Sequence, residues 1–508
     1  MNRTQGMALL GKYVHGSKTH PLASPQGDLE GWGYSYLDSG HPEDQALAEI
    51  AVESAELCFQ QVQEGFFSAP QRLGFFKLLI EMFESQSENL SLLVSQEIGK
   101  PLSLARIELS RCLKTLQLSA RLINELKPGG LSGPVQTRLR GPLLAITPFN
   151  FPINLSLHKI APALALGCPV VWKPSPKASL CAASVFDIFK NAGLPEGFLN
   201  LVFCDNPTTL KIAQNSKIKT VSFTGSGPIG WSLKSKLQKP MTLELGGAAP
   251  VFVSAQINEI HFEAVVERIL KGAFSNAGQS CISIQSVFCQ SSVYEKLKKL
   301  LIEKTRTFPW GHPRNTQTLC GPVIDSEAQV RIQSLLHEIE NKGWVKNICR
   351  SENFFSTAPE LPPNATLRMK DPLTRPQLTP DSNCFIAPQI FEVSTDFDLN
   401  SFSFLKEEVF GPVFFLIETK DDLKNWIPKV NEWPSRLQTA VFTENTDEIS
   451  MAKNSLDFGG IVINESSSQR DDALPYGGEG QAGLGREGPE WTARDLLSYP
   501  QAVLEYFY

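Results

Sequence analysis

Closely spaced metal-binding residues are missing from this chain of 508 residues. Its 10 cysteines are scattered without a Cys-x-x-Cys pair, and its 7 histidines are few and dispersed. This spacing argues against a zinc site and against a disulfide framework. We therefore predict no bound metal, and a large chain with reduced thiols suits the cytoplasm.

An excess of positive charge and long apolar runs are also missing. The net charge is -6, whereas a general nucleic-acid binder is usually basic. No uninterrupted apolar run approaches the length of a membrane span, and Met1 to Val14 lacks the apolar core of a signal peptide. We expect a soluble, cytoplasmic protein with neither nucleic acid nor a membrane as its partner.

The chain is too long for one ordinary core, so two or more domains are expected. Apolar spacing predicts helices in these ranges: 45–64, 71–98, 155–166, 180–191, 229–237, 261–275, 292–308 and 326–341. Short apolar runs predict strands in these ranges: 143–147, 169–172, 199–203, 220–224, 241–245, 413–417 and 460–464. Alternating strands and helices indicate the α/β class, with open parallel sheets that bind ligands at the carboxyl ends of their strands. Residues 351–381 are rich in proline, threonine and asparagine and are expected to form a long loop or insertion.

Cys281 differs from the other cysteines in its setting. Most cysteines are small core residues, and four here have the apolar neighbours of that class: Cys58, Cys112, Cys168 and Cys289. Cys281 instead follows the small, flexible, polar segment Gly278-Gln279-Ser280. A thiolate in such a place can attack a carbonyl carbon.

Two polar residues can assist that thiolate. Glu244 lies beside Gly246 and Gly247 among apolar neighbours, and burial would raise the pKa of its carboxyl into a useful range for a base. Asn150 stands between prolines and aromatic residues that can fix its amide as an oxyanion donor. The ordinary alternatives are a surface acid at a strand end and an asparagine that caps a turn.

Three further segments can bind a nucleotide, each with an ordinary alternative. Residues 225–230 match G-x-G-x-x-G after a predicted strand, although glycine is common and Pro228 can simply start a helix. Lys173 leaves a strand end and can reach ribose or phosphate, or lie solvated in a turn. Glu408 and Phe410 can face one side of an extended segment, or belong to a solvated edge.

In chain order, the motifs from about Gly141 to Gly488 resemble those of the aldehyde dehydrogenase superfamily. The resembling segments are Ile146-Thr147-Pro148-Phe149-Asn150-Phe151-Pro152, Trp172-Lys173-Pro174-Ser175, Phe223-Thr224-Gly225-Ser226, Leu243-Glu244-Leu245-Gly246-Gly247, Asn276-x-Gly278-Gln279-x-Cys281, Glu408-Val409-Phe410-Gly411-Pro412, and Pro475-Tyr476-Gly477-Gly478 through Gly483-Leu484-Gly485-Arg486-Glu487. Each motif is modest alone, and the ordered set is very specific.

The resemblance implies two Rossmann-like α/β domains and a small β bridging element. The cofactor domain is expected at residues 1–120 and 140–246, the catalytic domain at 247–482, and the bridging and oligomerisation element at 121–139 and 483–508. That element would combine the arm near residues 121–139 with a C-terminal strand at residues 502–507, and in such folds these pieces pair with another subunit. Its open edges imply a homodimer or homotetramer.

The resemblance also implies NAD- or NADP-dependent oxidation of an aldehyde through a thioester on Cys281. Asn150 would stabilise the oxyanion and Glu244 would activate water. The cofactor-binding residues that it implies are Ile146, Thr147, Lys173, Ser175, Gly225, Ser226, Gly230, Leu245, Gly246, Glu408 and Phe410.

The cofactor site departs from the family at one informative position. The family usually has a glutamate where this chain has Pro176, and that glutamate binds the adenine ribose in members that prefer NAD. Lys173 and Lys177 remain as positive partners for a 2′-phosphate. We therefore expect NADP to be accepted and any preference for NAD to be weak.

The segment Asn464 to Asp472 resembles the substrate loop of members that act on small polar or anionic aldehydes. Arg470 in this loop could bind a carboxylate or phosphate, or form a surface salt bridge with Asp471 or Asp472. Two other functions stay open: transfer of the acyl group to coenzyme A, which Glu244 disfavours, and a non-catalytic structural role.

Overall fold

The computed structural model describes residues 37–126, 135–357, 384–394 and 403–502, and the backbone of residues 3–5, 7–9, 12–14, 18–21 and 32–36. Most of the predicted loop at residues 351–381 lies outside these ranges, as does the predicted strand at 502–507 beyond Ala502. Among the described residues, no helix is long and apolar enough to cross a membrane, and no cluster of histidine, cysteine and acidic residues could hold a metal ion.

The first of two large sheets has eight strands in the order β23-β11-β10-β7-β8-β9-β2-β3. Its strands are β2 (Met7–Leu9), β3 (Lys12–Val14), β7 (Leu143–Ile146), β8 (Val170–Lys173), β9 (Leu199–Leu201), β10 (Thr220–Thr224), β11 (Met241–Glu244) and β23 (Gly483–Leu484). Its five central strands, β11 to β9, run parallel. Almost all of their residues are buried, as expected for a parallel sheet covered on both faces.

The helices that accompany this sheet are α1 (Pro42–Gln63), α2 (Ala69–Ser85), α3 (Ser87–Ile98), α4 (Leu102–Glu125), α5 (Asn154–Leu166), α6 (Ser179–Asn191), α7 (Asn206–Gln214) and α8 (Gly227–Ser235). The prediction of a single helix over 71–98 is wrong, because the helix is interrupted at Gln86, which separates α2 from α3. The helix predicted over 229–237 is α8, which begins two residues earlier, with Pro228 in its first turn.

The second large sheet has seven strands in the order β15-β17-β18-β13-β12-β20-β21, all parallel except for β15. Its strands are β12 (Pro250–Val253), β13 (Ser286–Gln290), β15 (Val345–Arg350), β17 (Gln389–Val393), β18 (Val413–Thr419), β20 (Gln438–Phe442) and β21 (Gly460–Ile463). The helices of this part are α9 (Phe262–Phe274), α10 (Ser291–Arg306), α11 (Ser326–Asn341), α12 (Ser403–Lys406), α13 (Leu423–Asn431) and α14 (Thr446–Ser455).

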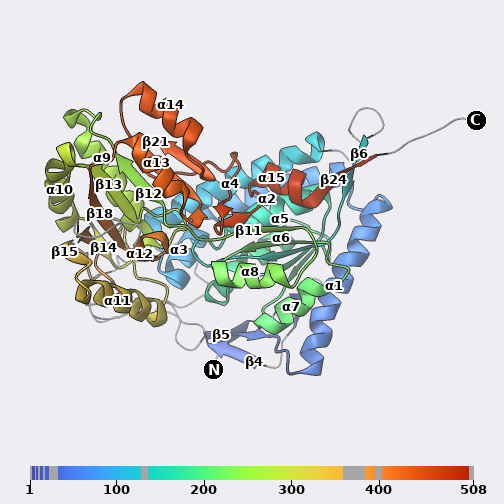
Figure 1. Cartoon of the computed structure of the whole chain (residues 1–508). Coiled ribbons are helices and arrows are strands. Elements are labelled where there is room, and N and C mark those ends of the chain that lie inside the picture. Colours follow the sequence, from blue (N-terminus) through green and yellow to red (C-terminus); the bar gives the residue numbers. More distant parts are fainter. Residues whose placement is uncertain are drawn as a thin grey trace, which may run out of the picture.

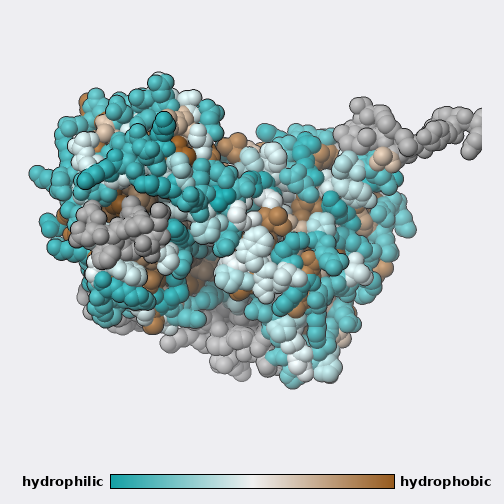
Figure 2. Space-filling model, in the orientation of Figure 1, coloured by the Kyte–Doolittle hydropathy of each residue, from teal (hydrophilic) through white to brown (hydrophobic). Residues whose placement is uncertain are grey.

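Each large sheet has its own hydrophobic core, and Figure 1 shows them as neighbouring lobes. Two mostly parallel sheets with buried strands confirm the predicted α/β class. The surface in Figure 2 is mostly hydrophilic, with hydrophobic residues in small separate groups.

Several shorter elements complete the fold. They are β1 (Arg3–Gln5), β4 (Lys18–Pro21), β5 (Trp32–Tyr36), β6 (Val135–Leu139), β14 (Trp310–Gly311), β16 (Phe354–Phe355), β19 (Ser435–Arg436), β22 (Glu479–Gly480), β24 (Ser498–Ala502) and α15 (Pro489–Trp491). β6 and β24 form a two-stranded antiparallel sheet of their own, far from the second lobe (Figure 1). Of the predicted bridging element, residues 121–125 belong to α4 and residues 483–484 to the first large sheet. The domain boundaries themselves stay predictions.

Candidate active site

The predicted cofactor residues of the first lobe lie at the carboxyl ends of four adjacent strands. Thr147 follows β7, Lys173 ends β8, Gly225 follows β10 and Leu245 follows β11. Parallel sheets bind their ligands at this edge, because the strand ends open into loops there. Ile146, Ser175 and Gly246 lie within two residues of these positions along the chain.

The turn from β10 into α8 supplies free backbone groups at that edge. Ser226 is the residue before the helix and is exposed, and its side chain does not cap the helix. A β-carbon at Gly230 would lie 2.6 Å from Leu245 Cδ2, so glycine lets α8 approach the loop after β11. The first turn of a helix attracts anions such as phosphate.

Lys173 and Lys177 differ in their availability. Burial lowers the pKa of the half-buried Lys173 ammonium, which has no hydrogen-bond partner among the described residues. Lys177 is exposed and pairs with Asp325. Lys177 thus has a carboxylate partner that the sequence did not reveal, and binding of a 2′-phosphate by either lysine stays a prediction.

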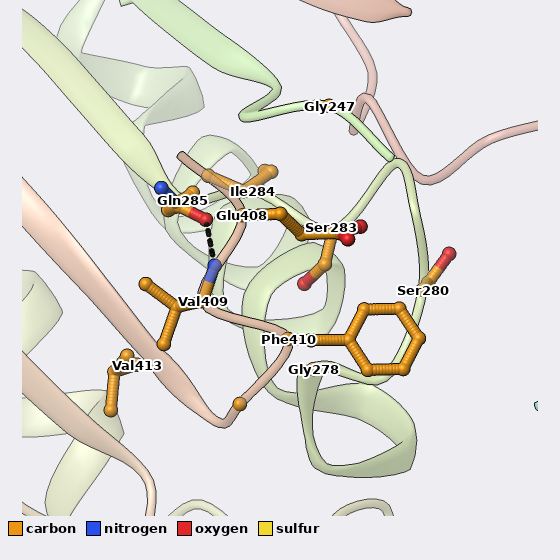
Figure 3. A pocket seen from close by; sticks show the side chains of 11 residues that line it. Gly247, Gly278, Ser280, Ser283, Ile284, Gln285, Glu408, Val409, Phe410 and Val413 are labelled. Atoms are coloured by element: carbon orange, nitrogen blue, oxygen red, sulfur yellow. Dashed lines mark hydrogen bonds between the residues drawn. The ribbon is translucent and has the colours of Figure 1, made fainter. Parts of the chain in front are cut away.

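Glu408 and Phe410 line a small pocket on the second-lobe side of the site, together with Gly247 and residues around the cysteine turn such as Gly278 and Ser280 (Figure 3). Oxygen Oε1 of Glu408 is buried without a hydrogen-bond partner, and burial raises the pKa of this carboxyl to about 8. A β-carbon at Gly246 would lie 2.3 Å from Glu408 Oε2, so a side chain there would displace the Glu408 carboxylate from its present position. This orphaned carboxylate in a pocket fits the hydroxyls of a nucleotide ribose, and a solvated edge is excluded for Glu408.

Cys281 follows a tightly held turn rather than a flexible one. Asn276, Ala277 and Gly278 have φ angles of 53°, 56° and 66°, a left-handed backbone that non-glycine residues rarely adopt. The Gln279 amide holds this turn, donating to Asn276 O at 3.1 Å and accepting from Ile324 N at 2.8 Å. Such a turn fixes the backbone that leads to the thiol.

The Cys281 side chain is half-buried and hydrogen-bonded. Its sulfur lies 2.8 Å from the hydroxyl oxygen of Tyr476. Burial raises the pKa of the thiol to about 12, although the Tyr476 hydroxyl acts to lower it. The four cysteines assigned to the core are all buried, which distinguishes Cys281 from them.

Asn150 lies directly beside the cysteine turn. Its amide nitrogen Nδ2 donates to Gln279 O at 3.0 Å, which leaves the second N–H for another acceptor. Its backbone oxygen accepts from Lys100 Nζ at 2.8 Å, and Lys100 in turn pairs with the buried Glu108. Asn150 is therefore buried, with hydrogen bonds that hold both its side-chain amide and its backbone carbonyl. It is not a residue that caps a turn at the surface.

Glu244 is buried, with both carboxylate oxygens lacking hydrogen-bond partners among the described residues. Burial, and then the neighbouring Glu487 carboxylate, raise the pKa of the Glu244 carboxyl well above 4.5. Burial would also raise the pKa of Glu487, but Lys159 at 2.7 Å and other positive neighbours hold it below its ordinary value. Two adjacent carboxyls with opposite shifts are typical of acid–base sites.

Arg470 is buried inside this site and forms neither predicted surface salt bridge. Asp471 pairs with Lys114, and Asp472 accepts two hydrogen bonds from Arg111. The Arg470 guanidinium instead lies 3.1 Å from His158 Nδ1 and 3.7 Å above the Tyr476 ring centroid. Its Nε–H has no hydrogen-bond partner among the described residues.

Sequence reasoning missed three side chains that support the site: Tyr476, Lys100 and Glu487. Tyr476 and Glu487 stand in motifs that were recognised, but a glycine-rich motif does not reveal a side-chain contact with Cys281. Lys100 lies 50 positions before Asn150 in the sequence, and the fold brings the two residues into hydrogen-bond contact. A lysine-proline pair after a predicted helix carried no signal for that contact.

The chain is similar to known proteins in sequence and in fold. The sequence profile of the aldehyde dehydrogenase family matches residues 35–355 and 369–500. A lactaldehyde dehydrogenase from Methanococcus maripaludis is 31% identical over 448 residues, which cover 86% of this chain and 88% of that protein. A 3-sulfolactaldehyde dehydrogenase from Priestia aryabhattai is 29% identical over 479 residues, 91% of this chain and 93% of that protein.

Two solved structures are similar over nearly the whole chain. Aldehyde dehydrogenase 21 from Physcomitrella patens, in complex with the reaction product succinate, has a TM-score of 0.84 and 25% identity, covering 99% of this chain and 98% of that chain. The glyceraldehyde-3-phosphate dehydrogenase GapN from Methanocaldococcus jannaschii, complexed with NADP, has a TM-score of 0.79 and 27% identity, covering 99% of both chains.

Proposed function

The chain belongs to the aldehyde dehydrogenase family, and from this premise we propose that it oxidises a small polar or anionic aldehyde to the carboxylic acid by way of a thioester on Cys281. The observation that carries the proposal is the buried, unpartnered Glu244 carboxyl in the site of a fixed cysteine and a fixed amide. Enzymes of this family use NAD or NADP, whose chemical contribution is to accept the hydride of the aldehyde.

The nucleotide would be held by the groups at the strand ends of the first lobe and by the pocket. Lys173, Ser226 and the start of α8 would take its ribose and phosphates, and Glu408 with Phe410 the nicotinamide end. The orphaned Oε1 atom of Glu408 and the close approach of Gly246 support this placement.

Cys281 would act as the thiolate and attack the aldehyde carbon. The developing oxyanion would accept hydrogen bonds from the free N–H of the Asn150 amide and from the Cys281 backbone N–H. After hydride loss the carbon is a thioester carbonyl bound to Cys281. Glu244, once ionised, would take a proton from water, whose oxygen attacks the thioester and releases the acid and the thiol.

Arg470 supports the choice of a small anionic or polar substrate. Its guanidinium is buried near the thiol, where it acts on the pKa of Cys281, and one N–H is unpartnered. A carboxylate, phosphate or sulfonate on the aldehyde would satisfy such a donor. The relatives named for lactaldehyde and 3-sulfolactaldehyde are consistent with a short polar chain.

A spectrophotometric assay tests the proposal against its alternatives. Short anionic and neutral aldehydes are supplied with NAD or NADP, with and without coenzyme A. We expect reduced cofactor to form without coenzyme A and to be fastest with small polar or anionic aldehydes. Strict dependence on coenzyme A would identify an acylating enzyme, and no reaction with any aldehyde would support a structural role.

Replacing Asn150 with alanine is expected to lower kcat by about a hundredfold, since one oxyanion donor is worth about 3 kcal/mol in the transition state. Single-turnover rates of cofactor reduction measure this step. Asn200→Ala is the control, because its buried amide also donates to a backbone carbonyl, that of Gly197, away from the site. Equal rates for the two variants would remove Asn150 from the mechanism.

Replacing Pro176 with glutamate is expected to shift the cofactor preference toward NAD by about tenfold or more. A carboxylate there could bind the ribose diol and would repel a 2′-phosphate. The values of kcat/KM for NAD and NADP, in the wild type and the variant, measure the change. Strict use of NAD by the wild type, with no shift in the variant, would show that this position does not set the choice.

We further propose a cytoplasmic homodimer or homotetramer. Within the part of the chain that the structure describes, the sheet of β6 and β24 has two strands, and Tyr499 on it is exposed. Open strand edges of this kind pair readily with another chain.

A further inference from the structure

The phenol of Tyr476 reaches the reactive sulfur from outside the cysteine turn. The hydroxyl oxygen lies 2.8 Å from Cys281 Sγ, close enough for a hydrogen bond. A thiolate can only accept, so in the reactive state the phenol O–H is the donor. Of the other two assigned catalytic residues, Asn150 donates to Gln279 O and Glu244 has no hydrogen-bond partner among the described residues, so neither bonds to this sulfur.

Three independent contacts fix the tyrosine in place. Its backbone pairs with Glu487 in both directions, at 2.9 and 2.6 Å. Its ring packs with Ile282, Leu437 and Ala482 in a small buried cluster against Cys281. The Arg470 guanidinium covers the ring face at 3.7 Å from the centroid, within the range of a cation–π contact. The hydroxyl is therefore aimed at the sulfur before any substrate binds.

The surroundings of the thiol make such a donor valuable. Burial has the largest influence on the pKa of the Cys281 thiol. The neighbouring groups that influence this pKa are, in decreasing order, Tyr476, Glu408, Arg470 and Glu244. Burial and the two carboxyls oppose the thiolate, whereas the Tyr476 hydroxyl and the Arg470 charge favour it. Tyr476 is the member of this set that is hydrogen-bonded to the sulfur.

We propose that Tyr476 is a fourth catalytic residue, whose hydroxyl donates a hydrogen bond to Cys281 Sγ and stabilises the thiolate before it attacks the aldehyde. Arg470 assists by holding the ring and by favouring negative charge beside it. The inference rests on the proposed role of Cys281 as the nucleophile.

The size of the effect follows from the balance between thiolate fraction and thiolate reactivity. Losing one hydrogen bond to a charged group raises a thiol pKa by about one unit or more. The remaining thiolate becomes more nucleophilic, with a Brønsted slope of about 0.4–0.5. At any pH below the pKa, a one-unit rise therefore slows attack by about threefold.

The test is the rate at which iodoacetamide alkylates Cys281 between pH 6.5 and pH 10, followed by peptide mass spectrometry. Tyr476→Phe removes only the hydroxyl. We expect its profile to shift to higher pH, with alkylation at pH 8 slowed by about threefold or more. Tyr294→Phe is the matched control, because it removes a buried phenol bonded to Glu392 at 2.7 Å in the same lobe. A Tyr476→Phe profile that superimposes on the wild type would overturn the proposal.

A second measurement guards against misfolding of the variant. Replacing all tyrosines with 3-fluorotyrosine makes each phenol a stronger donor, and the native fold keeps its tyrosine rings. We expect faster alkylation of Cys281 in the fluorinated wild type, whereas an unchanged or slower rate would contradict the proposal. No aldehyde or cofactor is present in either experiment, so the inference can fail while aldehyde oxidation by Cys281 stands.

Discussion

Replacing Cys281 with alanine is expected to abolish aldehyde oxidation, with kcat lowered by a factor on the order of 10⁴ or more. The variant has no sulfur at position 281 to form the thiohemiacetal. Of the other nine cysteines, seven are buried, and Cys204 and Cys384 are half-buried at other places in the fold. Cofactor binding should persist, because the proposed nucleotide residues are untouched. Steady-state assays and equilibrium binding of the reduced cofactor by fluorescence measure the two properties.

Cys289→Ala is the matched control for this loss. Cys289 lies eight positions along the chain in β13, is fully buried, and sits among core residues. Its replacement removes a thiol of similar size without touching the site, so turnover should stay near the wild-type value. A Cys281→Ala enzyme with near-normal turnover would show that the reaction does not pass through this sulfur.

Replacing Glu244 with glutamine is expected to separate the two halves of the reaction. The amide keeps the shape of the buried side chain but cannot take a proton from water. One equivalent of reduced cofactor should form in a burst, and steady-state turnover should then fall by about 10²- to 10⁴-fold, the usual contribution of a general base. Stopped-flow absorbance measures the burst and the slow phase in one record.

Glu97→Gln is the matched control for the base. Glu97 is also fully buried with a raised carboxyl pKa, about 7, but it accepts hydrogen bonds from Leu180 N and Cys181 N at the start of α6. Its replacement should lower the stability of the fold. The variant should turn over steadily, without a burst of reduced cofactor followed by a slow phase. Normal steady-state turnover in Glu244→Gln would remove Glu244 from the base role.

The architecture could be predicted well because its signals are local. The strand of residues 220–224 and the helix of residues 326–341 have the predicted bounds, since apolar spacing and a capping Asp325 mark them clearly. The break at Gln86 was missed: residues 84–89 contain no apolar residue, but Phe83 and Leu90 on either side are seven positions apart, a spacing that one continuous helix also allows. Burial of Glu244 could also be inferred, from its apolar neighbours and the adjacent glycines.

The contacts that tune the site could not be predicted, because they join distant parts of the chain. Lys177 pairs with Asp325 across 148 positions of the chain, and Arg111 pairs with Asp472 across 361 positions. Only the fold therefore shows that Asp471 and Asp472 pair with other side chains and not with Arg470. The hydroxyl of Tyr476 is the same kind of feature, since a motif specifies a residue and not the atom that it touches.

The most direct test of the central claim is the mass of the Cys281 peptide from Glu244→Gln enzyme, quenched with acid after one turnover with aldehyde and cofactor. The proposed function predicts that this peptide gains the mass of the acyl group only when both reactants are present, and that hydroxylamine removes it as expected for a thioester. An acyl group on another residue, or a burst of reduced cofactor without any acylated Cys281, would contradict it.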